Sequence, residues 1–303
     1  MSAFLQYTVN GITVGSFYAL VALGYTMVYG IIRLINFAHG DFFMVGAFVS
    51  LGVLGALGSG TLPSGVVVMA ALLAAMTITG ALGAAAARVV YLPLLKAPQL
   101  SLLVSALGLS LALEYGTALT QGTSFKSVPH FQFLSADHAV ALTSDVRLTY
   151  AQLAVVGISL LLMVSLYVFV QHTMTGTSMR TLAMDADAAR LVGINVERTI
   201  LLTFFIGGGL AGVAGLMYAL YYPQINFLMG FLLGLRAFTA AVLGGIGNIP
   251  GAMVGGILIG LLESYATASV SGRWTDVVVF GVLIAVLVVR PRGLLGERVA
   301  ERV

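Results

Sequence analysis

The chain has 303 residues, of which 59% are hydrophobic and only 8% carry a charge, and its mean hydropathy is +1.05. Soluble domains average about 25% charged residues, so too few polar side chains are present to cover the surface of a soluble domain. The composition predicts an integral membrane protein. The net charge of +3 comes from basic residues scattered at the ends of apolar segments, which is typical of membrane orientation, and no nucleic-acid role is predicted.

Nine apolar runs follow one another along the chain, most of them close to the ~20 residues that cross a bilayer as a helix. They cover 9–32, 42–57, 66–87, 100–120, 151–170, 200–220, 227–247, 252–268 and 275–289. No Lys or Arg precedes the first run, so it lacks the charged region of a signal peptide and is expected to be a retained helix. We therefore expect a single all-α membrane domain over 1–303, a polytopic bundle of eight or nine transmembrane helices with one or more broken or re-entrant segments.

Basic residues near the ends of the runs fall mostly into alternate loops, which predicts the orientation of the chain. If the carboxyl terminus is cytoplasmic, the inner set is Arg33, Arg88, Lys96, Arg180, Arg190, Arg198, Arg290, Arg292, Arg298 and Arg302. The outer set is then only Lys126, Arg147 and Arg273. This excess predicts an amino terminus outside and a carboxyl terminus in the cytoplasm, with nine crossings, or eight if one short run is re-entrant. The mixed stretch 121–150 is expected to be an extracytoplasmic loop.

The segment 172–199 is the most polar part of the chain, and it is expected to lie in the cytoplasm. Ser178 is placed to cap a helix that runs to about Val192, and Gly193 is placed to end it. An apolar stripe recurs along this helix at three- and four-residue spacing: Leu182, Ala186, Ala189 and Val192. Because acidic and basic side chains share the polar face, docking into a groove of a partner protein is favoured over binding to lipid.

Ionisable or amide side chains near or inside the apolar runs are candidates for a translocation pathway, because burying a charge in hydrocarbon costs at least ~2.5–3.5 kcal/mol. They are Asn36, His39, Asp41, Glu114, Arg236 and Glu263. Most have a structural alternative. Asp41 can be a helix cap, His39 a packing residue and Arg236 an anchor near the outer surface. Both glutamates can snorkel or pair with a neighbouring helix.

The stretch 244–251, GGIGNIPG, interrupts the apolar sequence with helix breakers. It is either a tight turn between two helices or unwound backbone that lines a cavity, in which case Gly244, Gly245 and Asn248 join the pathway candidates. With the segment NFAHGD at 36–41 it suggests a pseudo-symmetric pair of interrupted segments. Three GxxxG pairs are weak indications of close helix packing: Gly11/Gly15, Gly208/Gly212 and Gly256/Gly260.

The residue patterns of several enzyme classes are missing. The chain has no cysteine, and its four histidines never occur at i and i+4, so thiol catalysis, thiolate zinc sites and an HExxH metalloprotease are excluded. Neither lysine follows a phosphate-binding glycine loop. No catalytic or metal-binding residue is predicted. A secondary transporter driven by H⁺ or Na⁺, with Asp41, Glu114 or Glu263 as proton carrier, stays open as an alternative.

Several blocks of the sequence carry a resemblance to a known family. Asp187-Ala188-Ala189, three residues and then Gly193 resemble the EAAxxxG coupling sequence of ABC importer permeases, with Asp in place of Glu. Four blocks, at 10–30, 35–47, 188–195 and 237–256, resemble the high-affinity branched-chain amino acid permease family, specifically its LivH-type subunit. The resemblance covers nearly the whole chain and is weakest at 57–75 and 121–150.

The resemblance implies a permease subunit of the bacterial cytoplasmic (inner) membrane. Its implied partners are a homologous LivM-type permease, two cytoplasmic ABC ATPase subunits and an extracytoplasmic substrate-binding protein. ATP and Mg would be bound by the ATPases, and no cofactor by this chain. The implied solute is a branched-chain or related neutral amino acid, with urea or an amide as the alternative. The residues that inherit the ATPase-coupling role are Arg180, Asp185, Asp187, Ala188, Ala189, Arg190, Gly193 and Ile194.

Overall fold

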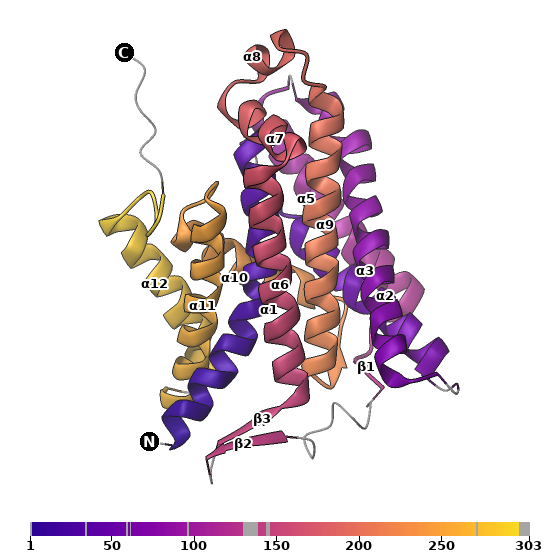
Figure 1. The fold of residues 1–303 in the computed structure, drawn as a ribbon, viewed down its shortest axis with the longest axis vertical. Helices are drawn as coiled ribbons and strands as arrows, with labels where there is room; N and C mark the ends of the chain where they lie inside the picture. The colour runs from indigo at the N-terminus through magenta and orange to yellow at the C-terminus, as the bar shows by residue number, and fades with distance from the viewer. Residues whose placement is uncertain are drawn as a thin grey trace.

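The computed structural model describes residues 2–33, 35–58, 60, 62–95, 97–129, 139–143, 146–270 and 272–296. Within these ranges, eight helices are long and apolar enough to cross a membrane, which confirms the predicted all-α polytopic fold (Figure 1). They are α1 (Ser2–Ile32), α2 (His39–Gly58), α3 (Ser64–Ala86), α5 (Gln99–Gln121), α6 (Tyr150–His172), α9 (Val196–Tyr221), α11 (Ile249–Ser269) and α12 (Thr275–Val289). The span of α3 continues through the following short helical turns as Ser64–Leu94, and that of α12 includes the preceding 3₁₀ turn as Gly272–Val289. A shorter apolar helix of 16 residues, α10 (Met229–Gly244), lies among them.

The remaining elements are short. A π-helical turn (Ala87–Tyr91) and α4 (Leu92–Leu94) extend α3, and α7 (Met174–Met184) and α8 (Ala186–Leu191) connect α6 to α9 at one end of the bundle. At the opposite end, β1 (Lys126–Ser127) pairs with β4 (Gln224–Ile225), and β2 (Ala139–Thr143) pairs with β3 (Val146–Thr149). Parts of the expected 121–150 loop, at 130–138 and 144–145, lie outside the described residues, as do Lys96, Arg298 and Arg302.

The two ends of the described chain lie at opposite ends of the bundle (Figure 1). α1 begins at the end that carries the short strands. After α12, the segment 290–296 folds back onto the turn between α10 and α11, where the amide of Leu295 donates to the carbonyl oxygen of Gly244 over 3.0 Å. The same turn lies beside α7, because Gly247 and Met179 line one small cavity. The described carboxyl end therefore lies on the side of α7 and α8.

Glycine contacts hold the central helices together. A Cβ atom on Gly15 of α1 would fall 2.7 Å from the Cα atom of Ile257 in α11, and one on Gly256 would meet the backbone of Ala19. On α9, a Cβ atom on Gly208 would fall 2.6 Å from the carbonyl oxygen of Thr79 in α3. The predicted GxxxG pairs therefore lie at real helix interfaces, where the missing side chains let the backbones touch.

Two helices begin inside the bundle instead of at its ends. The first residue of α2, His39, lies against Gly24 of α1 and Gly207 of α9, both far from the ends of their own helices. α10 begins beside the start of α2, since a Cβ atom on Gly234 would fall 2.8 Å from the Cα atom of Gly40. Both helices are therefore preceded by a non-helical segment that re-enters the bundle, as the prediction of broken segments requires.

Candidate functional site

The segments that lead into α2 and α10 have the same sequence pattern and the same local fold. Residues 35–40 are INFAHG and residues 225–230 are INFLMG. The side-chain oxygen of Asn36 accepts from the amide of Ala38 over 3.1 Å, and that of Asn226 accepts from the amide of Leu228 over 2.9 Å. We call these two INFxxG segments the first and second entry segments.

The two entry segments meet at their glycines, and the helices that follow them run in opposite directions. A Cβ atom on Gly40 would overlap the carbonyl oxygen of Gly230. α2 runs along α9 toward the strand end of the bundle, because Gly46 faces Gly212 and Gly215 faces Phe43. α10 runs toward the α7 end, where Gly244 contacts Gly251 at the start of α11. This opposition is the relation expected of an inverted repeat.

The prediction that pairs 36–41 with 244–251 as pseudo-symmetric segments is wrong. That stretch is a tight turn at the α7 end of the bundle, with Gly245 and Gly247 at φ values of +109° and +94°. Asn248 caps α11 by accepting from the amide of Gly251 over 3.0 Å. The structure therefore supports the interpretation as a tight turn, and Gly247 and Ile249 line the small cavity between this turn and α7. Repetition of INFxxG was the sequence pattern that could have identified Asn226 instead.

The first entry segment belongs to a buried polar cluster. The hydroxyl of Tyr91 donates to the side-chain oxygen of Asn36 over 2.6 Å, while the amide nitrogen of Asn36 has no partner among the described residues. Asp41 is fully buried, and Ser110 and Glu114 of α5 face its carboxyl group. Within the described chain, neither oxygen of Asp41 has a hydrogen-bond partner, and nor does Oε1 of Glu114.

The structure bears on the structural alternatives for three residues of this region, Asp41, His39 and Glu114. Asp41 is not a helix cap, because a cap would accept hydrogen bonds from the first turn of α2 and its oxygens accept none from the described residues. The ring of His39 packs 4.7 Å from that of Tyr25 and 5.9 Å from that of Phe42, while its Nε2 has no hydrogen-bond partner among the described residues. Its pathway role stays a prediction. Glu114 is buried, so it does not reach out to the bilayer surface.

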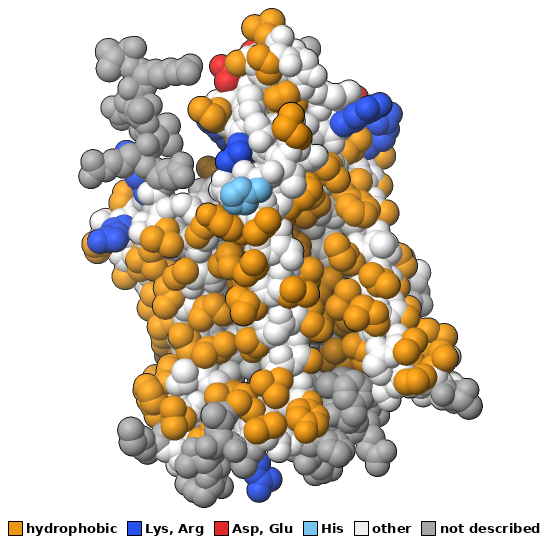
Figure 2. Space-filling model, in the orientation of Figure 1, with side chains coloured by type: hydrophobic (Ala, Val, Ile, Leu, Met, Phe, Trp, Pro, Cys, Tyr) orange, Lys and Arg blue, Asp and Glu red, His pale blue; other side chains and the backbone are white. Residues whose placement is uncertain are grey.

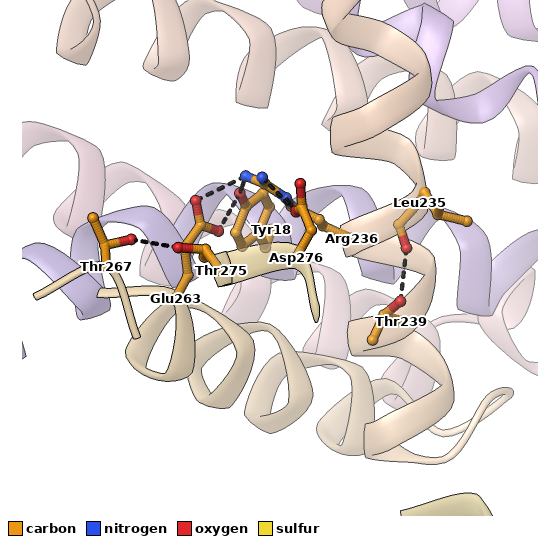
Figure 3. Close-up of polar contacts among 8 residues, drawn as sticks. All are labelled: Tyr18, Leu235, Arg236, Thr239, Glu263, Thr267, Thr275 and Asp276. Atoms are coloured by element: carbon orange, nitrogen blue, oxygen red, sulfur yellow. Dashed lines mark hydrogen bonds and ion pairs between the residues drawn. The ribbon is translucent and has the colours of Figure 1, made fainter. Parts of the chain in front are cut away.

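Arg236 and Glu263 form a second, separate cluster (Figure 3). The guanidinium group of Arg236 donates to Asp276 through Nε over 2.9 Å and Nη2 over 2.6 Å, and to Glu263 through Nη1 over 2.8 Å. The hydroxyl of Tyr18 donates to the other oxygen of Glu263 over 2.6 Å. This network joins α1, α10, α11 and α12. The prediction of Arg236 as a surface anchor is wrong, because only 16% of its side chain is exposed, whereas the pairing of Glu263 with a neighbouring helix is confirmed.

The predicted single helix from 178 to about 192 is wrong, because Asp185 divides it. Asp185 has extended backbone dihedrals, and its side chain accepts from the amides of Asp187 and Ala188, so that it ends α7 and caps α8. Ser178 lies inside α7, and Thr173 is the cap of that helix. Gly193 ends α8 as predicted. Its φ of +85° lets the amide of Ile194 donate to the carbonyl oxygen of Ala189 over 3.0 Å.

The break at Asp185 also divides the predicted apolar stripe. Leu182 and Ala189 are buried against the bundle, but Val192 is 71% exposed. Met184 and Leu191 are more exposed still, at 83% and 89%. These three side chains, Met184, Leu191 and Val192, are called the α8 tip, and hydrophobic side chains are visible at this end of the molecule in Figure 2.

Asp187, Ala188 and Arg190 lie in α8 beside the α8 tip, and Arg180 lies in α7. Arg190 and Asp187 form an exposed pair over 2.9 Å, and Ala188 is exposed beside them. Arg180 donates to Gln171 over 2.6 Å on the α7 side. The segment therefore presents charged side chains around an apolar projection.

Comparison with known proteins gives matches over the whole bundle. The model of a family described as "Branched-chain amino acid transport system / permease component" matches residues 7–287. The chain is 42% identical over 303 residues to the high-affinity branched-chain amino acid transport system permease protein BraD of Pseudomonas aeruginosa, covering 99% of this chain and 98% of that protein. It is 41% identical over 303 residues to the LivH permease protein of Escherichia coli K12, with the same coverage.

A more distant relative acts on a different solute. The fructose import permease protein FruG of Bifidobacterium longum is 28% identical over 145 residues, covering 46% of this chain and 42% of that protein.

Proposed function

Because this chain belongs to the family of branched-chain amino acid transport system permease components, we propose that it is the membrane subunit of an ATP-driven importer for branched-chain or related neutral amino acids. The chain is a multi-pass membrane protein and a transport subunit, not an enzyme. The near full-length identity to BraD and LivH supports this class of solute over the sugar named for FruG, which matches less than half of the chain.

The end that carries α7 and α8 faces the cytoplasm of a bacterial inner membrane. Seven described basic residues lie in the loops, short helices and helix ends on this side of the bundle: Arg33, Arg88, Arg180, Arg190, Arg198, Arg290 and Arg292. Three belong to the strand end: Lys126, Arg147 and Arg273. Loops rich in Lys and Arg stay in the cytoplasm, so this asymmetry supports an external amino terminus and a cytoplasmic carboxyl terminus. On the face drawn in Figure 2, the charged side chains lie above and below a hydrophobic central band.

The α8 tip is the observation that carries the coupling role. Met184, Leu191 and Val192 expose apolar side chains at an end of the molecule where water, not lipid, surrounds the chain. The charged pair of Asp187 and Arg190 borders this projection. A short helix with an apolar tip and a charged rim suits insertion into a groove of a cytoplasmic protein. We assign that groove to an ATPase subunit, which would bind the ATP and Mg.

The complete importer holds further chains. A second, homologous permease of the LivM type would complete the membrane part, and an extracytoplasmic binding protein would deliver the solute to the strand end. Isolating this chain gently from membranes tests the composition directly, since two ATPases and a second permease are expected to come with it. Uptake by this chain alone under an ion gradient would instead establish an ion-coupled transporter.

Two variants test the coupling role in the reconstituted importer. Gly193→Val forces a β-branched residue into a left-handed backbone conformation, and Asp187→Lys reverses a charge beside the α8 tip. Both are expected to abolish ATP hydrolysis stimulated by the loaded binding protein while membrane insertion is kept. Asp187→Glu keeps the charge at the same exposed position and serves as the control. Unchanged stimulation in both α8 variants would contradict the docking role.

A further inference from the structure

A cavity of about 430 Å³ lies beside the second entry segment, between α1, α9, α10 and α11. Its size falls in the range of about 300–1,000 Å³ that small-molecule sites occupy. One part of its wall is polar and consists of Tyr18, Arg236 and Glu263. Most of the remaining wall is apolar or aromatic and includes Tyr218, Tyr222, Phe227 and Leu232. A wall divided in this way suits a small amphipathic solute.

The polar part of the wall carries charges of both signs, Arg236 and Glu263. Arg236 contacts two carboxylates, Glu263 on the wall and Asp276 outside the lining of the cavity, so Glu263 shares this guanidinium group with a second acid. Only 15% of the Glu263 side chain is exposed, so its carboxylate is held away from bulk water at the edge of the cavity. A carboxylate has about four acceptor positions, and the bonds from Arg236 and Tyr18 occupy two of them. The remaining positions favour a cationic donor such as an ammonium group.

The start of α10 supplies the opposite polarity to the same cavity. Leu228 and Met229 line the cavity, and no side chain caps the helix that begins there. The amides of Leu228 and Met229 already donate to Asn226. A carboxylate would therefore meet the N–H groups that follow them in the first turn, where the helix dipole places partial positive charge. This arrangement favours a carboxylate group. The cavity therefore offers a site for each sign of charge and an apolar wall beside them.

We propose that this cavity binds an α-amino acid with an apolar side chain as a zwitterion, with the ammonium group at Glu263, the carboxylate at the first turn of α10 and the side chain against Phe227 and Leu232. The proposal rests on the proposed function and names the residues that hold its solute. The position agrees with transport, because the cavity adjoins the meeting point of Gly40 and Gly230, where two oppositely directed helices begin inside the bundle.

The absence of cysteine from the chain permits a direct test. Leu232→Cys places one thiol on the cavity wall, and Phe231→Cys, at a neighbouring and comparably exposed position that does not line the cavity, is the matched control. In the assembled importer without nucleotide, with any native thiols of the partner subunits removed, the rate of alkylation by N-ethylmaleimide is measured with leucine at millimolar concentration. Parallel samples contain 4-methylpentanoate, which lacks the ammonium group, or 3-methylbutylamine, which lacks the carboxylate.

Leucine is expected to slow alkylation at Cys-substituted position 232 by about five-fold or more, a difference of about 1 kcal/mol, and to leave the 231 variant unchanged. The two analogues are expected to protect little. Adding Glu263→Gln is expected to remove the protection by leucine, whereas Glu197→Gln, at an exposed ion pair, is expected to keep it.

Equal protection by all three compounds, or no protection by leucine, would overturn the proposal. If the variant with Glu263→Gln does not assemble, the comparison of the three compounds on Leu232→Cys alone still tests the proposal. If the importer takes up leucine but leucine does not protect Leu232→Cys from alkylation, the cavity is not the binding site, and the proposed function still holds. An assembled importer that carries no neutral amino acid would refute the proposed function.

Discussion

Gly15→Ala tests the packing of α1 on α11 with a single added methyl group. The added Cβ atom would lie 2.7 Å from the Cα atom of Ile257 and 2.9 Å from the carbonyl oxygen of Gly256, whereas ordinary contacts begin at 3.4 Å. Both neighbours are backbone atoms, so no side-chain rotation can relieve the overlap. The two helices must move apart by about 0.7 Å, and gaps of that size forfeit a quarter to a half of the dispersion energy of the contacts they open.

The expected loss follows from two opposing effects. Overpacking costs about 1–3 kcal/mol, and replacing glycine by alanine in a helix returns up to about 1 kcal/mol. Gly15→Ala is therefore expected to lower the free energy of unfolding by about 1–2 kcal/mol. Gly157→Ala in α6 and Gly108→Ala in α5 are the controls, because a Cβ atom at either position meets nothing within 4 Å. Their free energy of unfolding is expected to stay the same or to rise.

The assay is unfolding of the purified chain by SDS in mixed micelles, followed by far-ultraviolet circular dichroism. The reasoning depends on the difference between the two kinds of site and not on the absolute stability. If Gly15→Ala is as stable as Gly157→Ala, then α1 and α11 are not in backbone contact, and the account of their interface is refuted.

Two further variants probe charged groups by the same assay. Asp41→Asn is expected to keep the free energy of unfolding or raise it by about 1 kcal/mol, because it removes a fully buried acidic group that Ser110 and Glu114 face; a loss of stability would mean that the carboxylate accepts hydrogen bonds that an amide does not replace. Arg88→Ala breaks the 2.6 Å pair with Glu197, whose side chains are 66% and 54% exposed, so a change of at most about 1 kcal/mol is expected. A larger loss would show that water does not screen this pair.

The sequence identified the candidate residues better than it grouped them. Asp41, Glu114, Arg236 and Glu263 stand out as ionisable side chains in an apolar chain. No spacing in the sequence relates Asp41 to Glu114 of α5 or Arg236 to Tyr18 of α1. Those distances depend on how the helices cross. The sequence contains the INFxxG repeat at 35–40 and 225–230. The glycine- and proline-rich stretch 244–251 has more helix-breaking residues than the second repeat, so helix-breaking content alone favoured the wrong segment.

The coupling segment shows a similar limit. Periodicity alone predicted one helix over 178–192, since its apolar residues keep helical spacing across Asp185. The aspartate instead bonds to the amides that follow it, which is a competing local interaction that spacing does not reveal. As a result Ala189 packs inward while Val192 projects.

The sequence by itself was enough to predict that the chain is a membrane protein, how many long helices it has to within one, their approximate bounds, and its family. These follow from composition, run length and local similarity, which are properties of neighbouring residues. The tertiary structure alone decided that α2 and α10 begin inside the bundle, that their entry segments meet at Gly40 and Gly230, and that Arg236 and Glu263 border one cavity. Gly40 and Gly230 are about two hundred positions apart in the sequence, and their missing side chains let the two backbones meet. Which helices bring Tyr18 and Arg236 to Glu263 likewise depends on how the helices cross.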